Sequence, residues 1–393
     1  MKNDWEIKKL GEVCEINIGR TPERGNFKMW DKEKKTDNVW LSIADLNNTE
    51  KGYISDSTEY VSDNAVPKMK LVKANTLLMS FKLTIGRCAI TKRDLFTNEA
   101  IAALPILDKN LDLFFLKYYL ENFDWAKLTE GDVKVKGKTL NKEKLKEVPI
   151  TLPPLEEQKR IVKILDEKLA MLETVKANAK ANLQNAKDLF QSQLTKAFSN
   201  TTWEKKRLYE VCSITSKLVD PTLPEYLDLY HVGGANIESE TGIIIDLQTS
   251  KEEGLSSGKF TFDDTMVLYN KIRPYLKKVA RPDFNGLCSA DMYPLSPKTN
   301  ITKDYLYYIL TSNDFTEYAI SKSGRAGMPK VNREALFAYE CYIPPLSEQK
   351  RIVEQLDSLS EKVRSLEEIY TKQLANCDEL KQAFLAKAFN GEL

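Results

Sequence analysis

Residues 153–162 read PPLEEQKRIV, and residues 344–353 read PPLSEQKRIV. Nine of these ten positions are identical at an offset of 191 residues. The same offset relates Leu-Asp at residues 165–166 to Leu-Asp at residues 356–357. A constant offset over this distance indicates that the chain contains an internal duplication.

Each copy of this stretch predicts the start of a long helix. The proline pair ends an extended segment and supplies a residue for the first helical turn, where a missing N–H costs nothing. Behind it, apolar residues recur every seven positions in two registers, which is typical of a helix that pairs with another helix. They are Leu165, Leu172, Ala179 and Ala186 with Leu169, Leu183 and Phe190 in the first copy, and Leu356, Val363, Tyr370, Cys377 and Phe384 with Leu359, Leu366 and Leu380 in the second. Lys176 interrupts the first copy. We expect two helices of about 44 residues, roughly 65 Å each, to pair in antiparallel fashion.

The duplicated helix opening resembles the specificity subunit of type I restriction-modification systems. The sequence AFLAKAFNGEL at residues 383–393 is also similar to the carboxyl terminus of that family. The resemblance implies two target-recognition domains, each reading half of a split DNA sequence. It also implies two antiparallel helices that hold these domains apart and carry methyltransferase subunits.

The expected fold class is α+β, with two tandem α/β target-recognition domains, two long antiparallel coiled-coil helices and an internal pseudo-twofold repeat. The predicted segments are residues 1–152 (recognition domain 1), 153–200 (spacer helix 1), 201–343 (recognition domain 2) and 344–393 (spacer helix 2).

Within the recognition domains, the sequence predicts a shared outline with different loops. Short strands are expected at residues 39–43 and 76–81, and helices rich in aromatic residues at residues 113–122 and 305–312. The tripeptide at residues 44–46 corresponds to that at residues 235–237. One framework with two sets of loops suits two different reading surfaces, because loops carry function and tolerate change.

Composition describes an ordinary globular protein, with 42% hydrophobic and 29% charged residues. No run of eighteen apolar residues predicts a membrane span, and residues 1–6 have no apolar core of a signal peptide. The six cysteines are scattered without a CxxC pair, which favours a reduced, cytoplasmic setting.

The net charge of +1 does not by itself indicate a nucleic-acid partner, so the distribution of charge matters more. Residues 131–146 contain six lysines against two acidic residues. Lysines spaced two apart suit phosphate contacts, although a solvated charge run is the alternative. Arginine is the commonest reader of guanine edges. The predicted DNA-binding residues, all in or beside expected loops, are Arg20, Arg24, Lys82, Arg87, Lys134, Lys136, Lys138, Lys271, Arg273, Arg325 and Lys330.

No familiar catalytic or cofactor pattern is present. The glycines at 131 and 137 enclose five residues, whereas a P-loop needs four. The single histidine, His231, cannot join a multi-histidine metal site and is expected to be a polar structural residue. We therefore expect a non-enzymatic chain without a cofactor or metal of its own.

The favoured function is recognition of a bipartite, asymmetric double-stranded DNA sequence. The resemblance implies two methyltransferase subunits carrying S-adenosylmethionine, and restriction/translocase subunits using ATP and Mg. Two alternatives remain: a duplicated protein-binding coiled-coil scaffold or adaptor, and an enzyme with an unrecognised lysine- or cysteine-based site. Salt separates the first alternative from DNA binding, because counterion release makes DNA affinity fall steeply with salt.

Overall fold

A computed structural model of the chain describes residues 5–128, 133–134, 137–138, 140–324 and 327–393. The chain divides into two compact units. Unit 1 consists of residues 1–178 and 373–393, and unit 2 consists of residues 179–372. Each unit therefore contains a section of both long helices, α5 (Leu155–Phe198) and α11 (Leu346–Asn390). The division into four consecutive segments stays a prediction.

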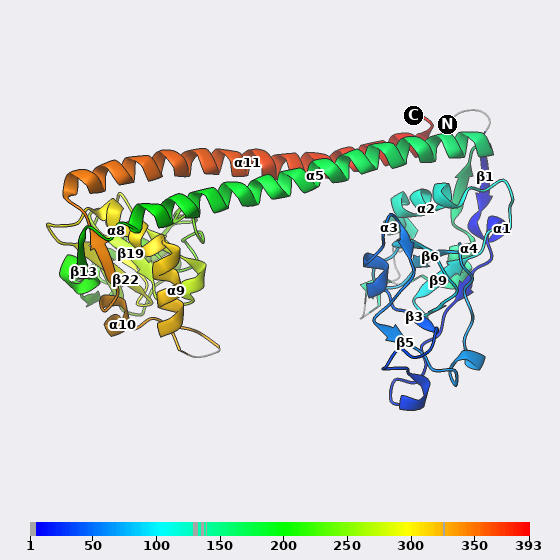
Figure 1. Cartoon of the computed structure of the whole chain (residues 1–393), viewed down its shortest axis with the longest axis horizontal. Helices are drawn as coiled ribbons and strands as arrows, with labels where there is room; N and C mark the ends of the chain where they lie inside the picture. Colours follow the sequence, from blue (N-terminus) through cyan, green and yellow to red (C-terminus); the bar gives the residue numbers. More distant parts are fainter. Residues whose placement is uncertain (1–4, 129–132, 135–136, 139, 325–326) are drawn as a thin grey trace. The chain divides into compact units, whose positions relative to one another are not determined.

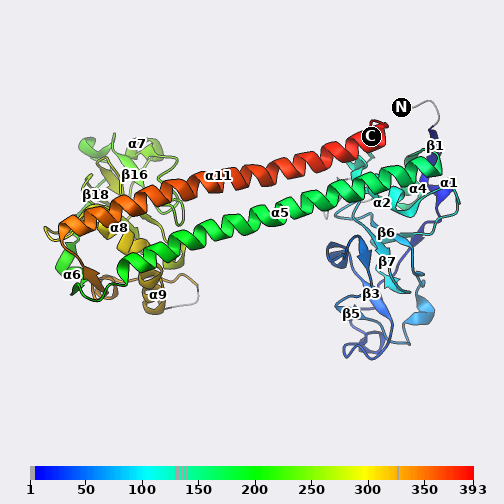
Figure 2. The ribbon, with the colours of Figure 1, turned by 45° about the horizontal axis from the view of Figure 1, so that its top comes forward.

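The sections of α5 and α11 within each unit lie side by side in opposite directions (Figures 1 and 2). In unit 1, Arg160 donates a hydrogen bond to the carbonyl of Leu393 at 2.6 Å, and Lys176 forms an ion pair with Asp378. In unit 2, the Lys187 ammonium lies 3.8 Å from the Glu367 carboxylate. Residue numbers rise along α5 while those of the partners fall along α11. The predicted antiparallel pairing is thus confirmed in each unit.

The heptad prediction is correct for α5 and only partly correct for α11. Ala179 and Ala186 are buried, as expected for positions that face a partner helix. Leu366 and Leu380 of α11, however, are 38% and 47% exposed. The inner positions of α11 are already filled by Val363 and Cys377, three residues before each leucine. The prediction that these two leucines belong to the buried seam is therefore wrong.

The globular part of unit 1 is built on two small sheets, with strand orders β2-β9-β6-β7-β4 and β5-β3-β8. Its strands are β1 (Glu6–Lys9), β2 (Asn17–Ile18), β3 (Val39–Leu41), β4 (Tyr53–Ile54), β5 (Glu59–Tyr60), β6 (Leu77–Ser80), β7 (Cys88–Thr91), β8 (Phe96–Thr97), β9 (Ile101–Leu104), β10 (Val133–Lys134), β11 (Gly137–Lys138) and β12 (Pro149–Leu152). The short helices are α1 (Leu10–Val13), η1 (Phe27–Met29), η2 (Ala44–Asn47), η3 (Val66–Lys68), α2 (Leu113–Asn122), α3 (Trp125–Leu128) and α4 (Lys142–Lys146). The core joins the larger sheet to α2, to the start of α5 and to Leu385 and Ala388 of α11.

The globular part of unit 2 has strand orders β14-β22-β19-β20 and β15-β18-β21-β16-β17. Its strands are β13 (Glu204–Arg207), β14 (Cys212–Ser213), β15 (Leu218–Val219), β16 (Tyr230–Val232), β17 (Gln248–Thr249), β18 (Lys259–Phe262), β19 (Val267–Asn270), β20 (Val279–Ala280), β21 (Gly286–Cys288), β22 (Met292–Pro297) and β23 (Glu340–Ile343). The short helices are α6 (Leu208–Val211), η4 (Pro224–Tyr226), α7 (Ser250–Glu253), η5 (Pro274–Leu276), α8 (Lys303–Thr311), α9 (Asn313–Lys322) and α10 (Arg333–Phe337).

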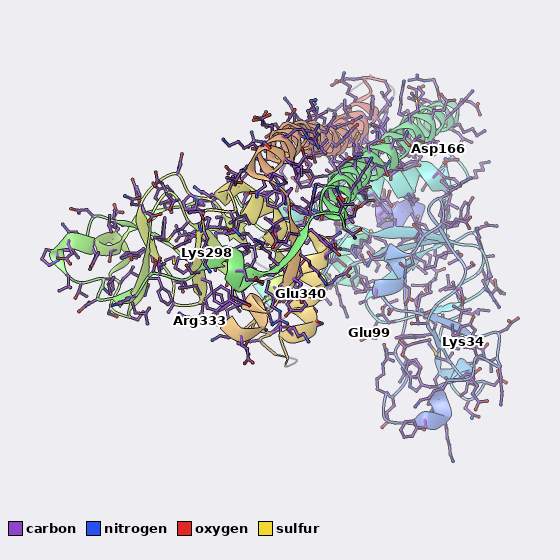
Figure 3. The ribbon with its side chains drawn as sticks, turned by 60° about the vertical axis from the view of Figure 1, so that its left-hand side comes forward. Lys34, Glu99, Asp166, Lys298, Arg333 and Glu340 are labelled. Carbon is purple, nitrogen blue, oxygen red and sulfur yellow. The ribbon has the colours of Figure 1, made fainter. Side chains whose placement is uncertain are left out.

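Both domains are closed by the same pairing of their first and last strands. Strand β1 pairs antiparallel with β12 in unit 1, and β13 pairs with β23 in unit 2. In unit 2, Glu340 of β23 (labelled in Figure 3) reinforces the pair through ion pairs with Lys205 and Arg207 of β13. The segment just before each long helix is therefore held by the start of its own domain.

A buried glutamine in each duplicated motif anchors the domain to its long helix. Gln158 is fully buried, where it accepts a hydrogen bond from the Asp112 amide and donates to the carbonyls of Asn110 and Pro153. Gln349 makes the equivalent three bonds in unit 2. These bonds join the turn before α2 or α8 to the first turn of α5 or α11.

The repeated aspartate of each long helix makes a second duplicated contact. The Tyr118 hydroxyl donates to Asp166 at 2.5 Å in unit 1, where Figure 3 labels the aspartate. The Tyr308 hydroxyl donates to Asp357 at 2.6 Å in unit 2. Arg281 adds a third member in unit 2, because its guanidinium contacts both Asp357 and Asp304. The anchoring is therefore similar in the two units but more highly charged in unit 2.

Candidate nucleic-acid interface

The two units present an equivalent pair of loops. One loop links β6 to β7 in unit 1 and β19 to β20 in unit 2, and the other precedes α4 or α10. The two loops of each pair are joined by one matching hydrogen bond, from the Leu140 amide to the Phe81 carbonyl and from the Val331 amide to the Lys271 carbonyl. The helix that follows is capped by an asparagine in both units. This correspondence aligns the candidate surfaces residue by residue.

In unit 2, the structure brings together three of the predicted DNA-binding residues. Ile272 and Lys330 form an antiparallel bridge between the two loops, and the Arg273 amide donates to the Pro329 carbonyl at 2.8 Å. Lys330 and Arg273 are exposed. Lys271 is instead 8% exposed, and its ammonium donates to the Ala290 carbonyl at 2.5 Å.

Lys271 therefore has a different role from its two neighbours. Its ammonium also lies 5.1 Å from the centre of the Tyr293 ring. Burial lowers the pKa of Lys271, and the nearby Lys330 lowers it further. These contacts stabilise the base of the loop, whereas Arg273 and Lys330 face solvent.

In unit 1, Lys82 and Arg87 flank the corresponding loop. The Lys82 ammonium lies 5.4 Å from the centre of the Phe81 ring, and the Arg87 guanidinium contacts the Asn47 side chain. Lys134 and Lys138 are in the hairpin β10–β11, whose strands precede Leu140. The predicted residues Lys136 and Arg325 lie outside the described residues.

Arg20 and Arg24 belong to another part of unit 1, the segment between β2 and η1. The Arg24 guanidinium lies 4.3 Å from the Trp30 ring centre and 4.8 Å from that of Trp40, and it forms an ion pair with Glu59. Arg20 donates a long hydrogen bond of 3.4 Å to the Lys68 carbonyl. Arg24 thus holds the small sheet together, and DNA contact by either arginine stays a prediction.

Sequence reasoning missed residues that share these loops. Lys278 of unit 2 aligns with Arg87, since the carbonyl of each accepts a hydrogen bond from the last residue of the preceding strand. Arg333 follows the capping asparagine of α10 and is exposed. Aligning the strands β6 and β19, rather than the motifs alone, is the signal that identifies them.

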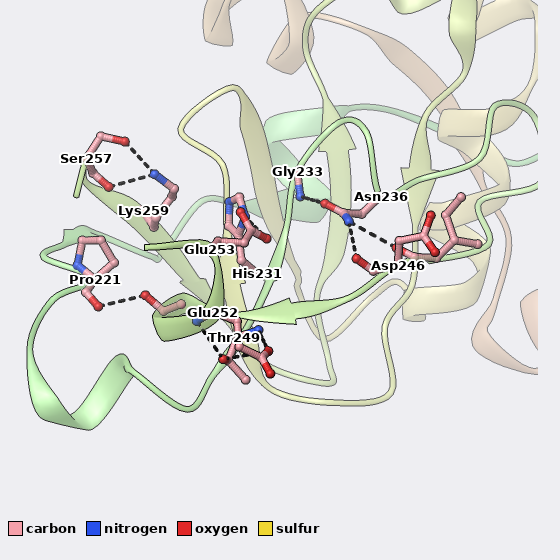
Figure 4. A network of polar contacts seen from close by, with 12 residues as sticks. Pro221, His231, Gly233, Asn236, Asp246, Thr249, Glu252, Glu253, Ser257 and Lys259 are labelled. Carbon is pink, nitrogen blue, oxygen red and sulfur yellow. Dashed lines mark hydrogen bonds and ion pairs between the residues drawn. The ribbon is translucent and has the colours of Figure 1, made fainter. Parts of the chain in front are cut away.

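His231, the only histidine of the sequence, is part of a polar network beside the five-stranded sheet of unit 2 (Figure 4). His231 is buried, and its Nδ1 lies 3.0 and 3.1 Å from the two Glu253 carboxylate oxygens. Asn236 accepts a hydrogen bond from the Gly233 amide, as Asp45 does from the Ser42 amide in unit 1. The predicted correspondence of residues 44–46 and 235–237 therefore has a structural basis, namely a side chain that closes the same turn.

The described part of the chain contains no group of three or more His, Cys, Asp or Glu side chains arranged to hold a metal ion. Within the same residues, no helix has both the length and the apolar surface needed to cross a bilayer. All six thiols are free and buried. Burial raises the pKa of Cys14, Cys212, Cys288 and Cys341 to about 12.

Comparison with known proteins gives one consistent result. The family model described as type I restriction modification DNA specificity domain matches residues 2–184 and again residues 200–374. The EcoDI type I restriction enzyme specificity subunit of Escherichia coli is 32% identical over 74% of this chain and 71% of its own length. The MjaIX specificity subunit of Methanocaldococcus jannaschii is 23% identical over 99% of this chain and 94% of its own length.

Solved structures show the same fold. A chain from a structural study of complex assembly and conformational transition of the type I R-M system superposes with a TM-score of 0.77 at 20% identity, and it covers 100% of this chain and 99% of its own. The HsdS subunit from Thermoanaerobacter tengcongensis gives a TM-score of 0.57 at 19% identity, covering 100% and 98%. The family model matches both duplicated domains, and the fold with its paired helices agrees with it. The chain therefore belongs to the type I restriction-modification DNA specificity family.

Proposed function

We propose that each unit of this specificity subunit recognises one half of a split, asymmetric DNA sequence. The observation that carries the proposal is the duplicated loop pair, which is joined by a matching backbone hydrogen bond in both units but has different residues. A repeated framework with divergent exposed loops suits two unlike half-sites. Exposed basic residues at these loops, such as Arg273 and Lys330, supply the charge that duplex DNA attracts.

The long helices are proposed to dock the two methyltransferase subunits. Apolar side chains that the helix pair leaves exposed support this role, because exposed apolar surface on a folded protein marks interaction sites. They are Met171, Val175 and Leu380 in unit 1 and Leu189, Leu366 and Ile369 in unit 2. Leu366 and Leu380, which the heptad pattern placed in the buried seam, are thus proposed to contact a methyltransferase subunit instead of the other long helix. Restriction/translocase subunits are proposed to join the resulting methyltransferase complex.

We also propose that the chain itself is non-catalytic and acts in the cytoplasm. The methyltransferase subunits would carry S-adenosylmethionine, and the restriction subunits would use ATP and Mg. The buried thiols support a non-catalytic role for this chain, because a thiol whose pKa is about 12 has almost no nucleophilic thiolate at neutral pH.

The test is an exchange of one recognition domain. Residues 1–152 are replaced by the equivalent segment of a relative with a known target, and methylation is mapped at base resolution in cells that carry the complete complex. We expect one half of the methylated sequence to change and the other to remain. The matched control exchanges residues 201–343 and should change the opposite half. A single continuous target, or a change in both halves after either exchange, would refute the proposal.

Salt dependence distinguishes DNA recognition from an adaptor role. The logarithm of the binding constant for duplex DNA should fall linearly with the logarithm of the salt concentration, with a slope of about −0.9 per neutralised phosphate. If Lys136 and Lys138 contact phosphates, replacing both with alanine should weaken binding to all sequences and reduce this slope. An unchanged affinity would favour the solvated charge run for these lysines.

A further inference from the structure

One equivalent position in the two candidate loops adopts a left-handed backbone without being glycine, and Lys277 of the unit 2 loop does so as well, with φ = 47°. Leu83 has φ = 64°, and Arg273 has φ = 52°. The two positions are structurally equivalent, since each is the third residue after the last residue of β6 or β19. This conformation is unfavourable for residues with a Cβ atom, and such outliers concentrate at functional sites. Its retention in both copies, with unrelated side chains, points to the position rather than to the residue type.

Leu83 and Arg273 are called the tip residues of their loops. Hydrogen bonds within the chain hold the backbone of both loops. In unit 2, the Ile272 amide donates to Asn270 Oδ1 at 3.1 Å, and the Arg273 amide donates to the Pro329 carbonyl at 2.8 Å. In unit 1, the Arg87 amide donates to Ser80 Oγ at 3.1 Å, and the Gly86 amide donates to the Ser80 carbonyl at 2.9 Å. A preorganised loop loses little conformational entropy when it enters a groove. These bonds hold the backbone at Arg273 in unit 2 and the two ends of the loop that carries Leu83 in unit 1.

The two tip side chains offer different chemistry to a base edge. Leu83 is 59% exposed and purely apolar. Arg273 is exposed, and within the described residues its guanidinium has no side-chain or backbone partner. In the major groove, an arginine fork matches guanine O6 and N7, whereas an apolar side chain contacts the thymine methyl group. The neighbouring basic residues, by contrast, suit phosphates, which fix register without reading sequence.

We propose that this left-handed position reads one base pair in each half-site, with Arg273 selecting guanine and Leu83 selecting thymine. The proposal rests on the proposed function, since it assigns each half-site to one unit. It makes the two positions specificity-determining residues. Lys330, which forms the antiparallel bridge with Ile272 in the adjoining loop, serves as a phosphate contact in the same surface.

The test replaces the tip residues with glycine in the complete complex of the chain with its methyltransferase partner. Glycine accepts a positive φ, so Arg273→Gly and Leu83→Gly remove the side chains without straining the loops. The probe is a library of duplex DNA randomised across both half-sites, and the bound fraction is sequenced. Asp246→Gly is the matched control, because Asp246 is exposed, has φ = 52° and lies outside the candidate loops. Lys330→Ala tests for uniform weakening.

At one position of one half-site, the wild-type complex should prefer guanine over other bases by roughly 5- to 150-fold. Arg273→Gly should abolish this preference. Leu83→Gly should weaken a thymine preference in the other half-site only, and Arg273→Leu should move the preference from guanine toward thymine. Asp246→Gly should leave the selected sequence unchanged. The proposal is overturned if both glycine variants select the wild-type sequence, or if they lose the methyltransferase subunits without changing base preference. If the wild-type complex itself selects no split sequence, the proposed function fails together with this assignment.

Discussion

Replacing Gln349 with alanine should destabilise unit 2 through the loss of three buried hydrogen bonds. The Gln349 side chain is fully buried and bonds to the Thr302 amide at 2.8 Å and to the carbonyls of Asn300 and Pro344 at 2.9 Å each. A buried hydrogen bond contributes a net 0.5–1.5 kcal/mol or so. The alanine variant should therefore lower the free energy of unfolding of unit 2 by about 2–4 kcal/mol.

Urea denaturation followed by circular dichroism measures this loss. With a denaturant slope of about 2 kcal/mol per molar urea, the midpoint of the unit 2 transition should fall by about 1–2 M. Hydrogen exchange should also accelerate in the turn that contains Thr302, because its amide loses its acceptor. The equivalent change, Gln158→Ala, should act on unit 1 alone.

Gln355→Ala supplies the matched control for this experiment. Gln355 lies six residues further along the same helix and is exposed, so its replacement should change stability by less than about 0.5 kcal/mol. If Gln349→Ala and Gln355→Ala have the same midpoint, the buried glutamine does not anchor the domain to the helix.

Three further outcomes follow from the paired helices and the buried thiols. Lys176→Leu should raise the urea midpoint, because leucine at this half-buried position gains up to about 1.5–3 kcal/mol while the ion pair with the exposed Asp378 contributes about 1 kcal/mol or less; a lower midpoint would contradict this reasoning. Inserting four residues after Ala179 adds about 6 Å of helix, so methylation mapping should show the unread gap longer by one or two base pairs with both half-sites retained; an unchanged gap would mean that the helices do not set the spacing. Since the pKa of Cys212 and of Cys341 is about 12, only about one thiol in 10⁴ is ionised at pH 8, and peptide mapping should detect labelling by a thiol reagent only after unfolding; rapid labelling of the native chain would show that these thiols are accessible.

The elements that the sequence predicted best are those with strong local signals. Helix α2 spans Leu113–Asn122, the same residues as predicted, because Asp112 caps its first turn and aromatic residues repeat along one face. The helix α5 likewise follows from its proline start and heptads. The five-stranded sheet of unit 2 was not predicted, since its strands are only two to four residues long and most of their pairing is non-local.

The candidate site was predicted only in outline. Charge and turn residues located the loops, yet they did not separate the buried Lys271 from the exposed Arg273 two residues later. That distinction depends on which carbonyl groups and rings lie beneath the loop. Leu83 was missed because basic residues alone were considered, and because its equivalent lies 190 residues later (273 − 83) rather than at the offset of 191 that relates the helix motifs.

Unit 1 is built from two separate stretches of the chain, and this affects the order in which the chain folds during synthesis. Leu385 and Ala388 are buried in its core, and the Phe389 ring lies 5.6 Å from that of Phe115 and 5.2 Å from that of Tyr119. Unit 2, by contrast, is made of one continuous stretch of chain. The domain that leaves the ribosome first is therefore completed last, after unit 2 is already in place. Until residues 373–393 have been translated, the apolar face beside α2 is uncovered. A chain that is released without these residues therefore contains a complete unit 2 and an aggregation-prone unit 1.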